Sequence, residues 1–134
     1  MKQFKCAITY GTYDLFHIGH LNLLERIAQL ADEVIVAVST DEFNALKGKR
    51  TVIPYPERAR IVAALRVVDQ VIPEMNWEQK TDDVLKYQCD LMVMGDDWLG
   101  RFDFLKQYCE VLYLPRTEGI STTIIRETMP VKNG

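Results

Sequence analysis

Five short, mainly apolar runs divide this chain, and each ends at a glycine, a proline or a polar residue. The run at 34–38 is mainly β-branched and uninterrupted, which favours a strand buried on both faces, as the strands of parallel sheets are. The predicted strands cover residues 4–10, 34–38, 71–72, 91–94 and 110–114.

Between these runs, apolar residues recur every three or four positions, which is the spacing of an amphipathic helix. The first predicted helix covers 18–31, and the second follows Pro54 and Pro56, with Ile61, Val62, Leu65 and Val68 on one face. A third covers 81–87 with Thr81 as the cap, and a short last helix runs from Ser121 to Pro130. Polar residues fill 39–50, where no element is predicted. The alternation predicts an open five-stranded parallel sheet with helices on both faces, a Rossmann-like α/β fold.

Length and composition are those of one globular domain. The chain has 134 residues, 48% of them hydrophobic and 26% charged, so we expect one domain over 1–134 with a frayed tail from about 130. The net charge of −3 argues against nucleic-acid binding, and no apolar run approaches the roughly 20 residues of a membrane span. Cys6, Cys89 and Cys109 are odd in number and form no C-x-x-C pair, which favours a reducing, cytoplasmic location.

Ligands of open parallel sheets bind just beyond the carboxyl ends of the strands. The segment after the first predicted strand, G-T-Y-D-L-F-H-I-G-H at 11–20, contains both histidines of the chain, His17 and His20. Their spacing places them on one face of the first turn of a helix, where N–H groups attract anions, and Gly19 allows close approach to the backbone. We expect the histidines to hold phosphate oxygens. The alternatives are a structural role and a zinc site, for which no third ligand is evident.

A second anion site is predicted after the last strand. There Gly119 frees the backbone, Arg116 supplies a bidentate charge, and the hydroxyls of Ser121, Thr122 and Thr123 crowd a helix start. Simple capping by Ser121 or Thr122 is the structural alternative.

The segment 47–66 is strongly basic, with six basic residues and one acidic residue, which give a local charge of +5. Lys47 and Lys49 flank Gly48 after the second strand, and we expect a mobile basic loop over a phosphate site there. Arg60 is assigned to a solvated helix face.

Several of these stretches resemble one protein family. The H-x-G-H pattern resembles the signature of the nucleotidyltransferase superfamily, which class I aminoacyl-tRNA synthetases share. R-T-E-G-I-S-T-T at 116–123 resembles the closing motif of the cytidylyltransferases, and S-T-D-E-F-N, V-I-P-E-M-N-W-E-Q-K and V-M-G-D-D-W extend the resemblance over about residues 8–127. Gly48 and Arg50 depart modestly from the lysine-rich family pattern around Lys49.

The resemblance implies transfer of a cytidylyl group from CTP to sn-glycerol 3-phosphate, giving CDP-glycerol and pyrophosphate for teichoic-acid or related surface-polymer synthesis. It also implies a homodimer and Mg²⁺ or a similar divalent cation. An acceptor phosphate oxygen attacks the α-phosphorus in line, so positioning and charge stabilisation carry the reaction, with no covalent nucleophile.

The same resemblance assigns roles to individual residues. It implies that His17, His20, Lys49 and Arg116 are catalytic and that Lys47 and Lys80 bind the acceptor. The implied nucleotide site consists of Thr12, Tyr13, His17, Ile18, Gly19, His20, Lys49, Arg66, Asp97, Arg116, Thr117, Glu118, Gly119, Ile120, Ser121, Thr122 and Thr123.

Two carboxylates follow predicted strands and are candidate metal ligands. Asp14 and Asp97 come after the first and fourth strands, and Mg²⁺ favours one or two carboxylates together with substrate phosphates. Capping of the helix near His17 is the alternative for Asp14, and recognition of the cytosine amino group is the alternative for Asp97.

Two other functions remain open on this fold. One is a nucleotidyltransferase that uses CTP or ATP with a different phosphorylated alcohol. The other is a nucleotide-binding module without activity, which the presence of both motif histidines, Lys49 and Arg116 disfavours. A tRNA synthetase is excluded because the chain leaves no room for a tRNA-binding domain and contains no K-M-S-K-S-like loop.

Overall fold

The computed structural model describes residues 2–116, and the last predicted helix, the tail and motif residues 117–123 lie outside the described residues. The strands are β1 (Phe4–Gly11), β2 (Ala31–Ser39), β3 (Gln70–Glu74), β4 (Leu91–Gly95) and β5 (Glu110–Leu114). They form one sheet in the order β3-β2-β1-β4-β5, in which every neighbouring pair is parallel. The predicted open parallel sheet is therefore confirmed.

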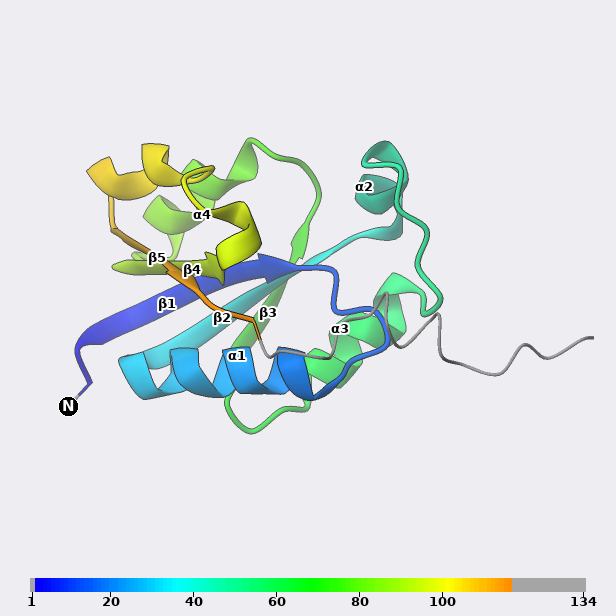
Figure 1. The fold of residues 1–134 in the computed structure, drawn as a ribbon, viewed down its shortest axis with the longest axis horizontal. Coiled ribbons are helices and arrows are strands. Elements are labelled where there is room, and N and C mark those ends of the chain that lie inside the picture. Colours follow the sequence, from blue (N-terminus) through cyan, green and yellow to red (C-terminus); the bar gives the residue numbers. More distant parts are fainter. Residues whose placement is uncertain (1, 117–134) are drawn as a thin grey trace, which may run out of the picture.

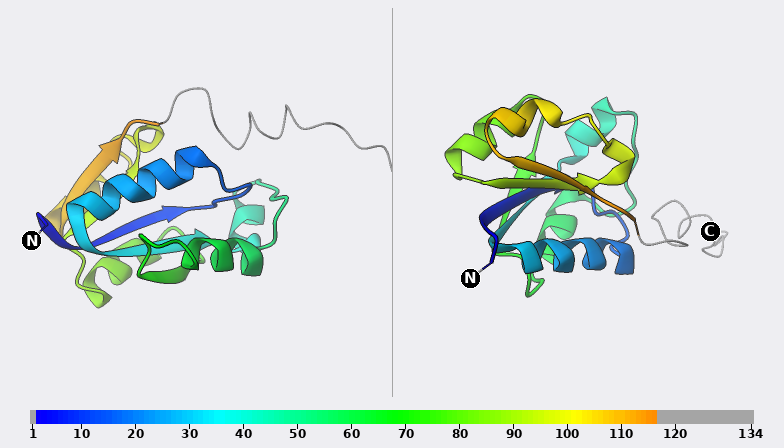
Figure 2. Two further views of the ribbon diagram at one scale, coloured as in Figure 1. Left: turned by 90° about the horizontal axis from the view of Figure 1, so that it is seen from below. Right: turned by 60° about the vertical axis from the view of Figure 1, so that its left-hand side comes forward.

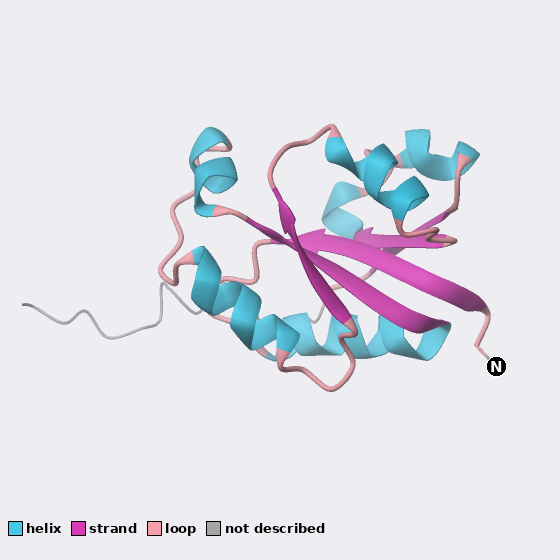
Figure 3. Ribbon diagram, turned by 180° about the vertical axis from the view of Figure 1, so that it is seen from behind, coloured by secondary structure: helices cyan, strands magenta, loops and turns pink. Residues whose placement is uncertain are grey.

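Helices cover both faces of this sheet. The helices α1 (Ile18–Leu30) and α3 (Tyr55–Ala63) lie on one face, and α4 (Gln79–Lys86) lies on the other together with the short 3-10 helices η1 (Asp96–Trp98) and η2 (Asp103–Gln107) (Figure 1). The right-hand view of Figure 2 shows the sheet as the middle layer, and Figure 3 shows the same three layers from behind. The helix α2 (Asp41–Leu46) lies beyond the carboxyl end of β2.

Alternate side chains of β1 enter two separate apolar layers, as the pleat of a strand requires. Ile8 packs in one cluster with Val84 of α4 and Leu105 of η2. Its neighbour Ala7 packs in the other cluster with Leu24 of α1. No helix within residues 2–116 is long and apolar enough to cross a membrane.

The helix α2 occupies the polar stretch after β2, where the hydrophobic pattern predicts no element. Thr40 caps it, since its hydroxyl accepts a hydrogen bond from the N–H of Phe43 at 3.1 Å. Asp41 and Glu42 in its first turn complement the helix dipole. Capping and charge thus determine this short helix, with burial contributed by Phe43 and Asn44.

The cap predicted at Thr81 is wrong, because α4 begins earlier, at Gln79. The Asn76 side-chain oxygen accepts from the N–H of Gln79 at 2.8 Å, and the Gln79 side-chain oxygen accepts from the N–H of Met75 at 2.6 Å. Two amide side chains therefore organise the start of this helix.

Two strand boundaries also differ from the prediction. The strand β2 begins at Ala31, directly after α1, and β3 continues through Pro73 to Glu74. Proline has no N–H to donate, but β3 is an edge strand and needs donors on one side only. Because all five strands are parallel, their carboxyl ends meet at one edge of the sheet.

Candidate active site

A cleft of about 910 Å³ opens at the carboxyl ends of the strands, which is a usual size for a small-molecule site. It lies where the strand order reverses, between β1 and β4. The predicted site residues that line it are Thr12, Tyr13, Asp14, His17, Gly19, His20, Lys47, Lys49, Lys80, Asp97 and Arg116. Motifs far apart in the sequence are thus brought together.

The two histidines form the start of α1. His17 is the N-cap residue, and its Nδ1 accepts from the N–H of Gly19 at 3.0 Å, while Nδ1 of His20 accepts from the N–H of His17 at 3.2 Å. This is the reciprocal arrangement of a capping box. Because both Nδ1 atoms accept hydrogen bonds, each neutral ring carries its proton on Nε2, which is the donor left for a ligand.

The imidazole rings are stacked, with centroids 3.8 Å apart and an interplanar angle of 21°. Burial lowers the pKa of His17, and burial followed by the nearby charge of His17 lowers the pKa of His20 to about 4. Both rings are therefore neutral near pH 7 and act as hydrogen-bond donors rather than as cations.

The backbone before α1 is strained. Tyr13 and Leu15 have φ values of 55° and 50°, in the left-handed region that non-glycine residues rarely adopt. The buried ring of Tyr13 lies edge-on to His20, with centroids 5.2 Å apart. A Cβ on Gly11 would lie 2.8 Å from this ring, so Gly11 allows Tyr13 to support His20.

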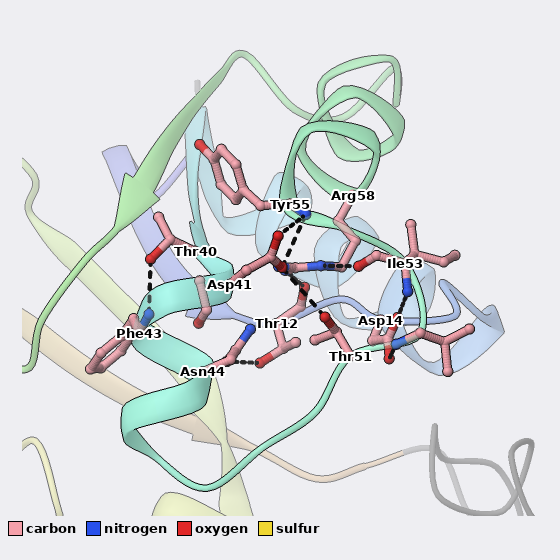
Figure 4. Close-up of polar contacts among 12 residues, drawn as sticks. Thr12, Asp14, Thr40, Asp41, Phe43, Asn44, Thr51, Ile53, Tyr55 and Arg58 are labelled. Carbon is pink, nitrogen blue, oxygen red and sulfur yellow. Dashed lines mark hydrogen bonds and ion pairs between the residues drawn. The ribbon is translucent and has the colours of Figure 1, made fainter.

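Asp14 fixes the basic loop, which we define as residues 47–53. Its carboxylate is buried, and the two oxygens accept from the N–H groups of Val52 and Ile53 at 2.8 and 2.9 Å (Figure 4). Its alternative assignment as the helix cap is wrong, because His17 holds that position.

Arg58 is the main residue near the cleft that sequence analysis missed. Its fully buried guanidinium donates to Asp41 at 2.8 Å, to the carbonyl of Thr12 at 2.7 Å and to that of Ile53 at 2.8 Å (Figure 4). The Tyr55 N–H and the Arg58 guanidinium lower the pKa of Asp41 against opposing burial. Arg58 thus joins the loop after β1, the basic loop and α2.

Two lysines and a glutamate form a second polar network at the ends of β2 and β3. The buried Glu74 accepts from Lys80 Nζ at 2.8 Å and from the Ser39 hydroxyl at 2.6 Å, and Ser39 accepts from Lys47 Nζ at 3.3 Å. Burial lowers the pKa of Lys47 to about 8, although Glu74 opposes this shift. The sequence analysis identified both lysines but not Glu74, which ends β3 as a charged residue at the same edge.

The basic segment 47–66 does not form one surface. Lys47, Lys49 and Arg50 line the cleft, whereas Arg58 is buried and Arg60 is exposed, as predicted for Arg60.

Two residues that were predicted to bind the nucleotide do not line the cleft. Ile18 is 54% exposed and lies outside the cleft lining. Arg66 lies on the exposed connection that leads to the amino end of β3, away from the cleft. The geometry therefore gives no support to its predicted contact with the triphosphate.

Two exposed charges complete the described rim. Asp97 follows β4, and its side chain folds back over Gly95, where an added Cβ would lie 2.8 Å from the Asp97 oxygen. Arg116 follows β5 and lines the same cleft. The cleft is thus rich in donors to anions and carries one exposed carboxylate on the β4 side.

This combination of a histidine pair at a helix start, a basic loop and an open parallel sheet defines a nucleotidyl-transfer class of site. The cytidylyltransferase-like family model matches residues 8–128. The chain therefore belongs to the cytidylyltransferase-like family, which confirms the family predicted from the motifs.

Relatives cover nearly the whole chain. It is 59% identical over 123 residues to a glycerol-3-phosphate cytidylyltransferase of Bacillus subtilis, covering 92% of this chain and 95% of the relative. It is 55% identical to that of Staphylococcus aureus, covering 93% and 95%. An ethanolamine-phosphate cytidylyltransferase of Mus musculus is 34% identical, over 84% of this chain but 30% of the mouse protein.

A solved structure shares the fold. The lipopolysaccharide core biosynthesis protein of Thermoplasma volcanium matches with a TM-score of 0.72 at 20% identity, over 86% of this chain and 99% of that chain. At this identity the match supports the architecture alone.

Proposed function

We propose that this protein transfers a cytidylyl group from CTP to sn-glycerol 3-phosphate, giving CDP-glycerol and pyrophosphate. The observation that carries the proposal is the cleft in which two neutral stacked imidazoles face a basic loop and a lysine pair. The bacterial relatives named for this activity, more than half identical over most of their length, support the choice of substrates.

The histidine motif serves the nucleotide in this proposal. His17 and His20 donate from Nε2 to α- and β-phosphate oxygens, at a helix start whose N–H groups also favour anions. Lys49 and Arg116 add positive charge on the cleft wall, and Thr12 and Tyr13 border the same space. Residues 117–123 are proposed to complete this site and lie outside the described residues.

The lysine pair serves the acceptor. Lys47 attracts the phosphate monoester, one of whose oxygens attacks the α-phosphorus while pyrophosphate leaves in line, and Lys80 contacts the alcohol part of the same acceptor. The acceptor oxygen is already anionic near neutral pH, so the site needs no general base. It has to bring two anions together and stabilise the charge that develops between them.

A divalent cation such as Mg²⁺ is part of the proposal, where it would neutralise part of the triphosphate charge. Among residues 2–116, no group of three or more histidine, cysteine or acidic side chains could hold an ion by itself. Mg²⁺ bound through substrate phosphates needs only one or two carboxylates, and the exposed Asp97 fits that role. Asp14 already accepts backbone N–H groups with both oxygens, so we assign it to loop positioning.

The test is pyrophosphate release across a panel of nucleotides and phosphorylated alcohols, with and without Mg²⁺. We expect turnover with CTP, glycerol 3-phosphate and Mg²⁺. Activity with ATP and not CTP, or with another phosphorylated alcohol only, would instead support the alternative nucleotidyltransferase.

We further propose that the enzyme is a cytoplasmic homodimer that supplies CDP-glycerol for a teichoic acid or a related surface polymer. The cysteines are free thiols in the described structure, which suits a reducing compartment. Light scattering coupled to gel filtration measures the mass in solution, and a mass near 15.5 kDa would contradict the dimer.

A further inference from the structure

Lys80 lies inside an enclosure of aromatic rings at the acceptor end of the cleft. Its Nζ is 4.6 Å from the ring centroid of Tyr10, 5.1 Å from that of Trp77 and 5.2 Å from that of Phe102. The residue is only 1% exposed. We call Tyr10, Trp77 and Phe102 the aromatic cage.

An acidic group closes the cage. Glu74, which is 3% exposed, holds Lys80 Nζ at 2.8 Å. Through Ser39 the same carboxylate is linked to Lys47, whose Nζ lies 4.4 Å from the ring of Phe43. Two ammonium groups therefore share one carboxylate, and Lys80 keeps its positive charge next to the open cleft.

Aromatic faces around a carboxylate are the surroundings that proteins use to bind organic ammonium ions. Here the chain's own ammonium group occupies that place. A lysine ammonium has three donors and no acceptor, and one donor of Lys80 is used by Glu74. An incoming group must therefore offer oxygen acceptors, and a second cation would meet like charge.

The difference between neutral and cationic acceptors matters within this family, because the mouse relative is named for ethanolamine phosphate, whose alcohol is cationic. We propose that Lys80, held by Glu74 in the aromatic cage, determines acceptor specificity by excluding cationic alcohol phosphates and admitting neutral polyol phosphates. This inference rests on the proposed function and adds the basis for selecting the acceptor.

A matched pair of acceptors tests the inference on the unmodified enzyme. Phosphoethanolamine and 2-hydroxyethyl phosphate differ only in an ammonium group against a hydroxyl. With CTP, we expect kcat/KM for the hydroxyl compound to exceed that for the amine by about 100-fold or more, because opposed like charges are costly in a desolvated site. Equal use of the two compounds by an enzyme that turns over glycerol 3-phosphate would overturn this inference alone.

Lys80→Met tests the residue itself. Methionine ends one atom short of the lysine nitrogen, so the substitution removes the charge and leaves the space of the ammonium group, between Glu74 and the three rings, for a substrate ammonium. We expect the ratio of kcat/KM for phosphoethanolamine to that for glycerol 3-phosphate to rise about 100-fold. Lys86→Met, at an exposed position of the same helix, should leave the ratio unchanged.

The double variant Glu74→Gln/Lys80→Met guards against a folding defect, since it leaves no unpaired buried carboxylate. In this double variant the ratio of kcat/KM for phosphoethanolamine to that for glycerol 3-phosphate should also rise, but by less than in Lys80→Met, because the Glu74 carboxylate is absent. A ratio that stays at the wild-type value in either folded variant overturns the assignment. Absence of turnover with glycerol 3-phosphate in the wild-type enzyme would overturn the proposed function, and this inference with it.

Discussion

Protonation of His20 is expected to destabilise the fold as the pH falls. The ring lies against Tyr13 and Phe16 and stacks on His17. Burial, then the charge of His17, lowers its pKa from 6.5 to about 4, while Asp14 opposes the shift. The unfolded chain binds this proton more tightly than the folded chain does. Stability that is complete above pH 6.5 is therefore lost as the pH falls toward 4, by about 3 kcal/mol.

The measurement is urea denaturation at a series of pH values between 7.5 and 4, followed by tryptophan fluorescence. The comparison variant is His20→Gln, because glutamine retains an acceptor for the capping box but does not titrate. Carboxylates titrate in this range in both proteins, so the difference between the two curves isolates His20. We expect the wild-type protein to lose about 3 kcal/mol more than the variant over this range.

Parallel curves for the two proteins would refute the reasoning, because they would show that His20 binds its proton equally well in the folded and unfolded chain. His17→Gln provides a further control. The pKa of His17 is also lowered by burial, but its ring is the N-cap and lies at the mouth of the cleft, so its contribution should be smaller.

Three further predictions follow from the site. His17→Ala should lower kcat about 100-fold or more in a pyrophosphate-release assay, while the protein still folds and loses only about 1 kcal/mol of stability with the cap of α1; near-normal turnover would refute its role. Arg58→Met should cost about 3 kcal/mol in urea denaturation because the carbonyls of Thr12 and Ile53 and the partly exposed Asp41 all lose their donor, whereas the exposed Arg60→Met should cost less than about 0.5 kcal/mol. Asp14→Ala should release the basic loop, so that limited proteolysis cuts within it faster than in the wild type; equal cleavage rates would contradict the tether.

Sequence analysis predicted the strands well because parallel strands buried on both faces appear as apolar runs. It failed at α2, whose six residues bury only Phe43 and Asn44 and show no apolar periodicity. The cap at Thr40 followed by Asp41 and Glu42 was the available signal. Hydrophobic spacing does not predict short helices that depend on caps and charge.

The cleft was predictable because strand ends in a parallel sheet share one edge, which brought Gly19, Lys47 and Asp97 together. Local charge predicted the cleft residues less well, because the basic segment 47–66 contains cleft-lining, buried and solvent-exposed residues. Arg58 precedes Val62 by one helical turn, on the buried face of α3. That position in the apolar stripe was the signal that this arginine points inward, and its partner Asp41 required the tertiary structure.

The tethering of the basic loop has a consequence for binding affinity. Both ends of the basic loop are held by hydrogen bonds. At one end the N–H of Lys49 donates to the carbonyl of Asn44 at 2.8 Å, and at the other end Asp14 accepts from the N–H groups of Val52 and Ile53. Fixing the backbone of a disordered residue costs about 1–2 kcal/mol, so a free loop would offset much of the attraction between its lysines and a triphosphate. Here folding has already ordered both ends, and the Coulombic attraction is available almost in full for holding the nucleotide.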